Sequence, residues 1–284
     1  MPELAEIKIM KDFINDVAHG RSFDAIWVSP FVEKRLPLPK PRDLAEFRIE
    51  ADARGKELLL TLHKNSHQPS LISGYSVLFS MGMSGHWTFV PHGDPPKHTH
   101  LSFVAQSGAK LCLVDARRFA RWKYSGWASH RGPCPLTDHQ NFRAGVLSNL
   151  NRRTFDRPIA EVLMDQRYFN GIGNYLRAEI LYRADQDPFE SARAAILNNP
   201  MLLELCMLVP GEAYAIGGGQ LKDWENPFQV PPDGFNSWIK CYGRSDRSVD
   251  IKGRTLWYFA SQVKKKDGQD DSRELLNGSH IETV

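Results

Sequence analysis

The hydrophobic pattern of the chain changes once, near residue 131, and this change limits the folds that the chain can adopt. Before it, short runs typical of β-strands alternate with Gly, Pro, Asn and Asp, as in a sandwich or barrel. These runs cover residues 25–28, 57–62, 76–80, 87–90, 101–105 and 110–114. After the segment Arg-Gly-Pro-Cys-Pro-Leu at 131–136, the pattern becomes helical. The sequence therefore predicts an α+β protein in which a β-sandwich precedes a helical domain.

This boundary gives a predicted domain organisation. Residues 1–135 are expected to form an N-terminal helix, over 4–17, and the β-sandwich. Residues 136–216 are expected to be helical, over 138–150, 159–167, 175–184 and 200–216. A glycine-rich loop and a two-stranded hairpin, with arms over 237–242 and 255–259, fill 217–260. The polar segment 261–284 has the composition of a disordered tail.

Composition and cysteine spacing narrow the class of protein. The 284 residues are 42% hydrophobic and 24% charged, with a net charge of +3, which is ordinary for a soluble globular protein. No apolar run has membrane-spanning length and no leader pattern is present, so we expect an intracellular protein without membrane contact. The four cysteines are scattered and form no C-x-x-C pair. This argues against a zinc ribbon and against a disulfide framework.

The first residues offer an unusual nucleophile. Removal of Met1 would leave Pro2 with a free secondary amine beside the carboxylate of Glu3. An α-amino group titrates near ~8, whereas a lysine titrates near ~10.4, so the terminal amine is far more often unprotonated at neutral pH. Such an amine can attack an electrophilic carbon and form an iminium. The alternative is that proline is simply tolerated at the start of a helix.

A glycine-bearing turn between two predicted helices is a candidate phosphate site. It lies in the string Phe-Asn-Gly-Ile-Gly-Asn-Tyr-Leu at 169–176, where the second helix opens beside Asn174. Backbone amides at a helix start bind anions, and Asn174 can add a side-chain donor. A packed helical hairpin without a ligand is the alternative.

Two loops at predicted strand ends carry a possible DNA wedge. Met83 lies in Met-Gly-Met-Ser-Gly, and Arg117 and Phe119 lie in Asp-Ala-Arg-Arg-Phe. If the loops meet, these side chains could fill the gap left by an extruded nucleotide. Singly, a Met is usually in a core and an Arg is usually solvated.

Basic residues elsewhere could contact phosphates. Lys56 follows Gly55 ahead of a strand, although a surface lysine is the simpler interpretation. Lys240 and Arg254 lie among tryptophans and tyrosines in the C-terminal hairpin, a mixture that suits nucleic-acid contact. Structural zinc needs four ligands, so the lone Cys241 cannot organise this hairpin and aromatic packing must hold it.

Together these motifs resemble the Fpg/Nei family of DNA glycosylases with associated lyase activity, over residues 2 to about 259. The motifs are Pro-Glu at 2–3, Arg-Gly-Lys at 54–56, Gly-Met-Ser-Gly at 82–85, Asp-Ala-Arg-Arg-Phe at 115–119, the string at 169–176 and Lys-Gly-Arg-Thr at 252–255. Within the family the chain looks most similar to the animal Nei-like branch whose finger has lost its zinc. The resemblance implies a catalytic N-terminal domain, a helix-two-turn-helix DNA-binding domain and a zincless β-hairpin finger.

The resemblance also implies roles for the catalytic residues. Pro2 would attack C1′ of a flipped, damaged nucleotide and expel the base, and Glu3 would be the acid that assists opening of the sugar ring. Lys56 matches the lysine assigned to phosphate contact and β-elimination. Arg254 matches the finger arginine assigned to phosphate contact and δ-elimination.

The implied DNA contacts complete the expected site. Asn174 matches the phosphate-binding asparagine, Met83, Arg117 and Phe119 match the void-filling wedge, and Lys240 matches a Nei-like position that contacts the lesion base. The implied substrates are oxidised pyrimidines and ring-opened purines in double-stranded or single-stranded DNA. No cofactor and no metal are implied. We expect a nuclear monomer of base excision repair, with downstream repair proteins as possible partners of the basic tail.

Three departures limit the transfer of these roles. Ala5 stands where many relatives carry proline, and Ser80 stands where relatives place a His or Arg. The loop at 217–223 looks more similar to the Fpg lesion-capping loop than to the Nei-like one, which leaves the preferred lesion open.

Three alternative functions remain open at this point. One is a damaged-DNA binding module without turnover, another is a tautomerase that uses an N-terminal proline as base, and a third is a helix–turn–helix regulator. The turn at Asn174 and the hairpin at Arg254 argue against the tautomerase. The pair Pro2–Glu3 is unexplained by the regulator.

Overall fold

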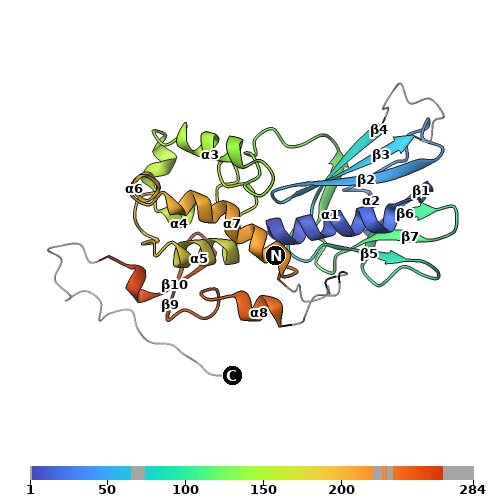
Figure 1. The fold of residues 1–284 in the computed structure, drawn as a ribbon. Coiled ribbons are helices and arrows are strands. Elements are labelled where there is room, and N and C mark those ends of the chain that lie inside the picture. Colours follow the sequence, from blue (N-terminus) through green and yellow to red (C-terminus); the bar gives the residue numbers. More distant parts are fainter. Residues whose placement is uncertain (1, 65–73, 220–225, 227, 229–232, 265–284) are drawn as a thin grey trace.

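The computed structural model describes residues 2–64, 74–219, 226, 228 and 233–264. Figure 1 shows β-strands at one end and a cluster of helices at the other, with the last strands and α8 lying beside the helices. The N-terminus lies where the two parts meet (Figure 1). The first residues are therefore placed to contact both parts, and the α+β class predicted from the sequence is confirmed.

The first helix, α1 (Leu4–Ala18), joins the two hydrophobic cores. Leu4 and Ala5 pack with the helical part, whereas the buried residues from Ile7 to Ala18 pack with the strands. The helix begins at Glu3, whose backbone N–H donates to the Glu6 carboxylate at 2.7 Å. This contact is half of a capping box, which satisfies an amide that the helix leaves without a partner.

The strands form one antiparallel eight-stranded sheet in the order β5-β7-β6-β1-β2-β3-β4-β8. Their bounds are β1 (Phe23–Val28), β2 (Phe47–Arg54), β3 (Glu57–Lys64), β4 (Gly74–Ser80), β5 (His86–Val90), β6 (Thr99–Ala105), β7 (Lys110–Val114) and β8 (Arg121–Tyr124). The recorded pairing of β1 with β2 is the single pair Phe23–Phe47, so the sheet divides there into two halves. A short helix, α2 (Pro30–Glu33), follows β1.

Aromatic side chains pack the two halves of the sheet against each other. The ring of Phe79 in β4 lies 5.2 Å from that of Trp87 in β5, and Phe47 in β2 lies 6.2 Å from Phe103 in β6. Edge-on ring contacts of this kind add to the burial of large apolar surfaces. The predicted strands are present, but β2 and β8 were not predicted. The alternation of apolar and charged residues in β2 is typical of a half-buried strand and could have indicated it.

The helical part has its own core. Its elements are α3 (His139–Leu147), η1 (Arg153–Asp156), α4 (Ile159–Val162), α5 (Asn174–Arg183), α6 (Ala192–Asn198) and α7 (Met201–Ala215). The helix expected over 159–167 is wrong beyond Val162, because residues 163–173 form turns that bring Gly171 and Gly173 against the N-terminal segment. The hydrophobic pattern of the sequence did not predict η1 and α6.

The C-terminal hairpin consists of β9 (Arg247–Asp250) and β10 (Thr255–Tyr258), with their connecting turn. The expected strand over 237–242 is wrong. Residues 234–238 form α8 (Gly234–Trp238), and the backbone amides that follow point at a buried carboxylate. That carboxylate is Glu179 of α5, which accepts from the amides of Lys240, Cys241 and Tyr242 at 2.8–3.1 Å.

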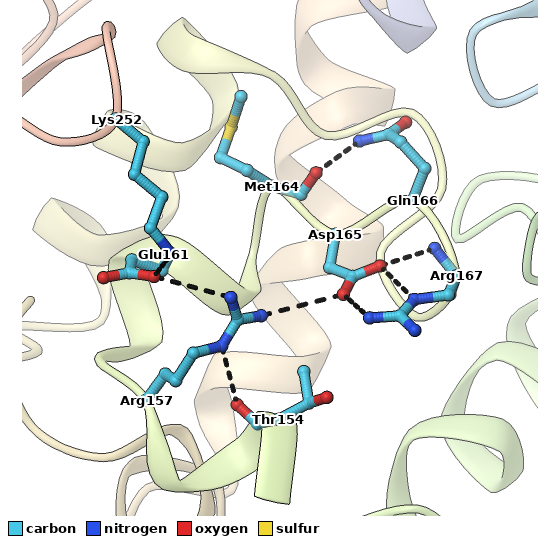
Figure 2. A network of polar contacts seen from close by, with 8 residues as sticks. All are labelled: Thr154, Arg157, Glu161, Met164, Asp165, Gln166, Arg167 and Lys252. Atoms are coloured by element: carbon cyan, nitrogen blue, oxygen red, sulfur yellow. Dashed lines mark hydrogen bonds and ion pairs between the residues drawn. The ribbon is translucent and has the colours of Figure 1, made fainter.

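The turn of this hairpin is anchored to the helical part by charged side chains, drawn in Figure 2. Lys252, at the tip of the turn, pairs with Glu161 of α4. Glu161 is also 3.6 Å from Arg157, which in turn approaches Asp165. Because Lys252 is largely exposed, its ion pair with Glu161 contributes little to the free energy of folding, on the order of 1 kcal/mol or less.

Residues 261–264 of the predicted tail are among the described residues. The helix η2 (Ala260–Gln262) ends the described chain, and Gln262 is buried, with its side chain donating to the Gln186 carbonyl at 3.2 Å. Residues 265–284 and 220–223 of the expected loop lie outside the described residues. All four cysteines are buried and free.

No single helix among the described residues has both the length and the apolarity to cross a membrane. Only α6 and α7 taken together, across a 93° bend, reach that length and composition.

The three amides around Glu179 predict a local defect in a Glu179→Ala variant. Removing the carboxylate leaves buried N–H groups without acceptors, each at about 1–3 kcal/mol. We expect hydrogen exchange of the amides at 240–242 to accelerate by at least tenfold, and urea unfolding to show a loss of about 2–4 kcal/mol. Glu33→Ala, at an exposed site, is the control. Unchanged protection at 240–242 would contradict this role for Glu179.

Candidate active site

The centre of the site is the Glu3 carboxylate at the N-terminus of α5. It accepts from the backbone amides of Tyr175, at 3.0 Å, and Leu176, at 3.3 Å. The residue before the helix must be glycine, because a Cβ at Gly173 would come within 2.2 Å of the Glu3 carboxyl carbon. The sequence predicted a phosphate site in the segment 169–176. In the structure, two backbone amides of this segment bind the Glu3 carboxylate instead.

Burial sets the protonation of Glu3. The side chain is 2% exposed. Loss of hydration raises the pKa of Glu3 to about 7, and the charge of Lys56 and the two amides oppose that rise. Glu3 is therefore poised to hold or release a proton near neutral pH, as a general acid requires.

A second buried carboxylate, Glu6, fixes the surroundings of Glu3. Besides the backbone amide of Glu3, it accepts from the Tyr175 hydroxyl at 3.0 Å and from the amide of Gly219 at 2.7 Å. Burial raises the pKa of Glu6. The residue thus connects the start of α1 to α5 and to the glycine-rich loop. The spacing of Glu3 and Glu6 is a capping-box signal that sequence reading could have used.

Lys56 is not a simple surface lysine. Its Nζ donates to the carbonyl of Ile172 at 2.9 Å, across the junction between the two parts. Burial lowers the pKa of Lys56 to about 8, while Glu3 opposes this shift and Arg254 adds to it. Gly55 precedes it at φ +58°, where a Cβ would overlap Asn170. The ammonium is therefore held close enough to Glu3 for each charge to shift the pKa of the other.

A cavity of about 480 Å³ opens beside these residues. It is lined by Glu3, Glu6, Met83, Asn174, Tyr175, Gly219, Phe235, Tyr242, Gly253 and Arg254. The structure therefore brings Glu3, Asn174, Met83 and Arg254 together, as expected from the sequence. Pro2 is buried directly before Glu3. The cavity size falls within the range of small-molecule sites.

One wall of the cavity is aromatic, which the sequence analysis did not single out. The ring of Tyr175 lies 5.2 Å from that of Phe235 and 6.4 Å from that of Tyr242. Aromatic surfaces of this kind stack on nucleobases. Helical spacing gave no signal for this wall, because its members come from α5, α8 and the segment after α8.

The two wedge loops meet. A Cβ at Gly82 would come within 2.7 Å of Phe119, and the Ser84 hydroxyl donates to the buried Asp115 carboxylate. The Arg117 guanidinium lies 4.8 Å from the centre of the Phe119 ring. Met83 and Phe119 are 41% and 44% exposed, which is unusual for large apolar side chains and leaves them free to contact a ligand.

Lys240 lies apart from the cavity lining. Its backbone N–H contacts Glu179, and its Nζ donates to the carbonyl of Ser237 at 3.0 Å. Ala5 is buried within α1 and Ser80 is exposed at the end of β4. Among the described residues, no cluster of His, Cys, Asp and Glu is arranged to hold a metal ion.

Comparison with known proteins finds relatives that match most of the chain. Residues 1–122 match the family model for the formamidopyrimidine-DNA glycosylase N-terminal domain. The chain is 39% identical to Endonuclease 8-like 1 of Homo sapiens, covering 91% of this chain and 72% of that protein. It is 30% identical to a formamidopyrimidine-DNA glycosylase of Legionella pneumophila, over 87% and 89% of the two chains.

Solved structures share the fold. The crystal structure of MutM (Fpg) from Thermus thermophilus superposes with a TM-score of 0.73 at 27% identity, over 92% of this chain and 98% of that one. A complex between the Lactococcus lactis Fpg and DNA containing an abasic site gives a TM-score of 0.76 at 17% identity, over 93% and 100% of the chains.

The fold and these matches define a DNA-binding repair enzyme, a DNA glycosylase with lyase activity at abasic sites. The chain belongs to the Fpg/Nei family, whose members act in base excision repair.

The buried Glu3 predicts an unusual pH dependence of stability. Its folded pKa, about 7, lies above the ordinary value of 4.5, so the folded state is penalised when Glu3 ionises. Glu3→Gln should therefore be more stable than the wild type at pH 8, by up to about 3 kcal/mol at ~1.4 kcal/mol per pKa unit.

The difference should shrink as the pH falls from 7 to about 4.5, because Glu3 is then protonated in both states. Urea unfolding of both proteins across this pH range measures it. A difference that does not vary with pH, or a variant less stable at pH 8, would contradict the burial argument.

Proposed function

We propose that this glycosylase works through a Schiff base at Pro2 and completes β- and δ-elimination. The observation that carries the proposal is the position of Glu3. Glu3 directly follows Pro2, and its carboxylate accepts hydrogen bonds from the first amides of α5. It lines the same cavity as Asn174 and Arg254. A nucleophile, a proton donor and phosphate contacts would then surround one extruded deoxyribose.

In the first steps, the Pro2 amine bonds to C1′ and the bond from C1′ to the damaged base breaks. The base leaves with the bonding electrons and takes up the proton that the Pro2 nitrogen loses on bonding to C1′, which restores the nitrogen lone pair. Glu3 then donates its proton to the ring oxygen as the C1′–O4′ bond opens, and the nitrogen lone pair completes the iminium. A pKa of Glu3 near 7 supports this role, because the acid form is populated at neutral pH.

The later steps remove the two phosphates. The iminium makes the C2′ proton acidic, so its loss expels the 3′ phosphate, and a further proton loss expels the 5′ phosphate. We assign Lys56 to phosphate contact and β-elimination, and Arg254 to phosphate contact and δ-elimination. The lowered pKa of Lys56, about 8, gives a fraction of neutral amine near pH 7 that can accept a proton.

The cavity wall supports a nucleobase substrate. We propose oxidised pyrimidines and ring-opened purines, in duplex or single-stranded DNA, with Asn174 on a phosphate and Met83, Arg117 and Phe119 in the gap left by the extruded nucleotide. One relative is named a formamidopyrimidine-DNA glycosylase, which fits ring-opened purines. Lys240 would contact the lesion base after its side chain leaves the Ser237 carbonyl.

We further propose a nuclear monomer whose C-terminal residues, beyond 264, recruit downstream repair proteins. The basic run at 264–266 supports this expectation, since clustered lysines attract acidic partners.

A damaged-DNA binding module without turnover is the competing function. It keeps every phosphate contact but lacks a free Pro2 amine, because an amide nitrogen at that position has no available lone pair. The proposed chemistry therefore requires that the bond between Met1 and Pro2 be cleaved. A tautomerase explains neither the wedge loops nor the position of Arg254.

The proposal predicts that a blocked N-terminus abolishes covalent chemistry. We would prepare the protein with a cleavable extension before Pro2 and test borohydride trapping on abasic DNA before and after the extension is removed. Only an imine is reduced to a stable adduct, so trapping should rise by at least a hundredfold on removal.

Binding to a stable abasic analogue, measured before and after removal, separates lost chemistry from lost DNA contact. Equal trapping by the blocked and released proteins would contradict the Pro2 mechanism. Unaltered binding without trapping in the released protein would favour the binding module.

A further inference from the structure

Arg177 is a charged residue deep in the helical part. It lies in the first turn of α5 and is only 1% exposed, so its guanidinium has little access to water. Its Nη1 donates to the carbonyl of Ala160 at 3.1 Å. Its Nη2 donates both to the Asn174 side-chain oxygen and, at 3.2 Å, to the carbonyl of Thr255.

These partners do not compensate the charge of Arg177. No carboxylate lies within ion-pair distance of it among the described residues, and its Nε has no hydrogen-bond acceptor there. Burial lowers the pKa of Arg177 to about 10; the more distant charge of Glu3 opposes this shift and that of Arg254 adds to it. Burying a cation that has no carboxylate within ion-pair distance costs several kcal/mol of folding free energy. An arginine at this position therefore does not serve stability alone.

The contacts of Arg177 converge on two residues of the site. By donating to the Asn174 oxygen, Arg177 fixes which way the side-chain amide faces. The Asn174 nitrogen then donates to the Thr255 carbonyl at 2.8 Å, and Arg177 donates to the same carbonyl. Thr255 directly follows Arg254 at the start of β10.

The geometry points to Arg177 as a positioning residue that locks Asn174 and Arg254 into one phosphate-binding arrangement. The claim rests on the proposed function for the roles of those two residues. Nη2 serves the Asn174 oxygen and the Thr255 carbonyl, while Nη1 holds the Ala160 carbonyl, so one planar guanidinium fixes three acceptors from two nitrogens. A lysine ammonium, with a single nitrogen, does not reproduce this arrangement.

The anchoring of the hairpin from two sides agrees with this role. Lys252 ties the tip of the turn to Glu161, and Arg177 ties the first residue of β10 to α5. Arg254 lies between these two contacts, and no partner of its side chain is recorded within the described residues. Its backbone is thus held while its guanidinium remains available to the cavity.

The test uses Arg177→Met, which keeps much of the side-chain volume but removes the donors. On abasic DNA the ratio of δ- to β-elimination products should fall about tenfold, and affinity for a duplex with a stable abasic analogue should fall about tenfold. The thermal midpoint should drop by no more than about 3 °C, because a buried uncompensated charge is lost together with its hydrogen bonds. Arg177→Lys should recover only part of the loss.

The matched control is Arg193→Met. Arg193 also donates to a backbone carbonyl, that of Leu150, but it lies on α6 away from the hairpin. The product ratio and the DNA affinity of the Arg193→Met variant should stay within twofold of the wild type.

A double-mutant cycle separates positioning from general damage. If Arg177 acts through Asn174, its effect on affinity should shrink below threefold in an Asn174→Ala background. An undiminished effect there, a wild-type product ratio and affinity in Arg177→Met, or a fall of the thermal midpoint beyond 8 °C would overturn the inference. DNA binding does not require the reaction. The affinity cycle therefore tests the positioning role of Arg177 even if the wild type does not carry out the proposed reaction.

Discussion

The hydrogen bonds from the first amides of α5 to the Glu3 carboxylate hold the site together. They join residues that are more than 170 positions apart in sequence and lie at the junction of the two cores. The helix N-terminus favours the ionised carboxylate, whereas burial disfavours it. The result is a carboxyl group that titrates near neutral pH in a fixed position. The close packing of Gly173 and Gly171 against Glu3 and Leu4 follows from this contact.

The C-terminal hairpin depends on α5 for a different reason. A two-stranded ribbon of this size is marginal alone and needs an external anchor. Here Glu179 accepts three successive amides before the hairpin, and Asn174 and Arg177 both donate to the first residue of β10. Successive turns of one helix therefore position Glu3, Asn174 and the base of the hairpin. Rigid elements of this kind keep a site preorganised.

Much of this arrangement could be read from the sequence, because the motifs at 2–3, 82–85, 115–119 and 169–176 are local. The fold class and most strands followed from hydrophobic period. The strand expected over 237–242 was wrong because the aromatic and apolar residues of this segment signal burial without showing that its backbone amides turn toward Glu179. Likewise, Lys56 contacts Ile172, 116 residues away in sequence, and Arg177 contacts Thr255, 78 residues away. No local pattern encodes such contacts.

The central claim is that the amine of Pro2, and not a lysine, forms the covalent intermediate beside Glu3. The most direct measurement is mass spectrometry of the peptides from a borohydride-trapped adduct with abasic DNA. The account predicts that the sugar remnant maps to the nitrogen of Pro2 in a chain that lacks Met1. A remnant on the Nζ of Lys56, a partly buried amine with a lowered pKa, would contradict it.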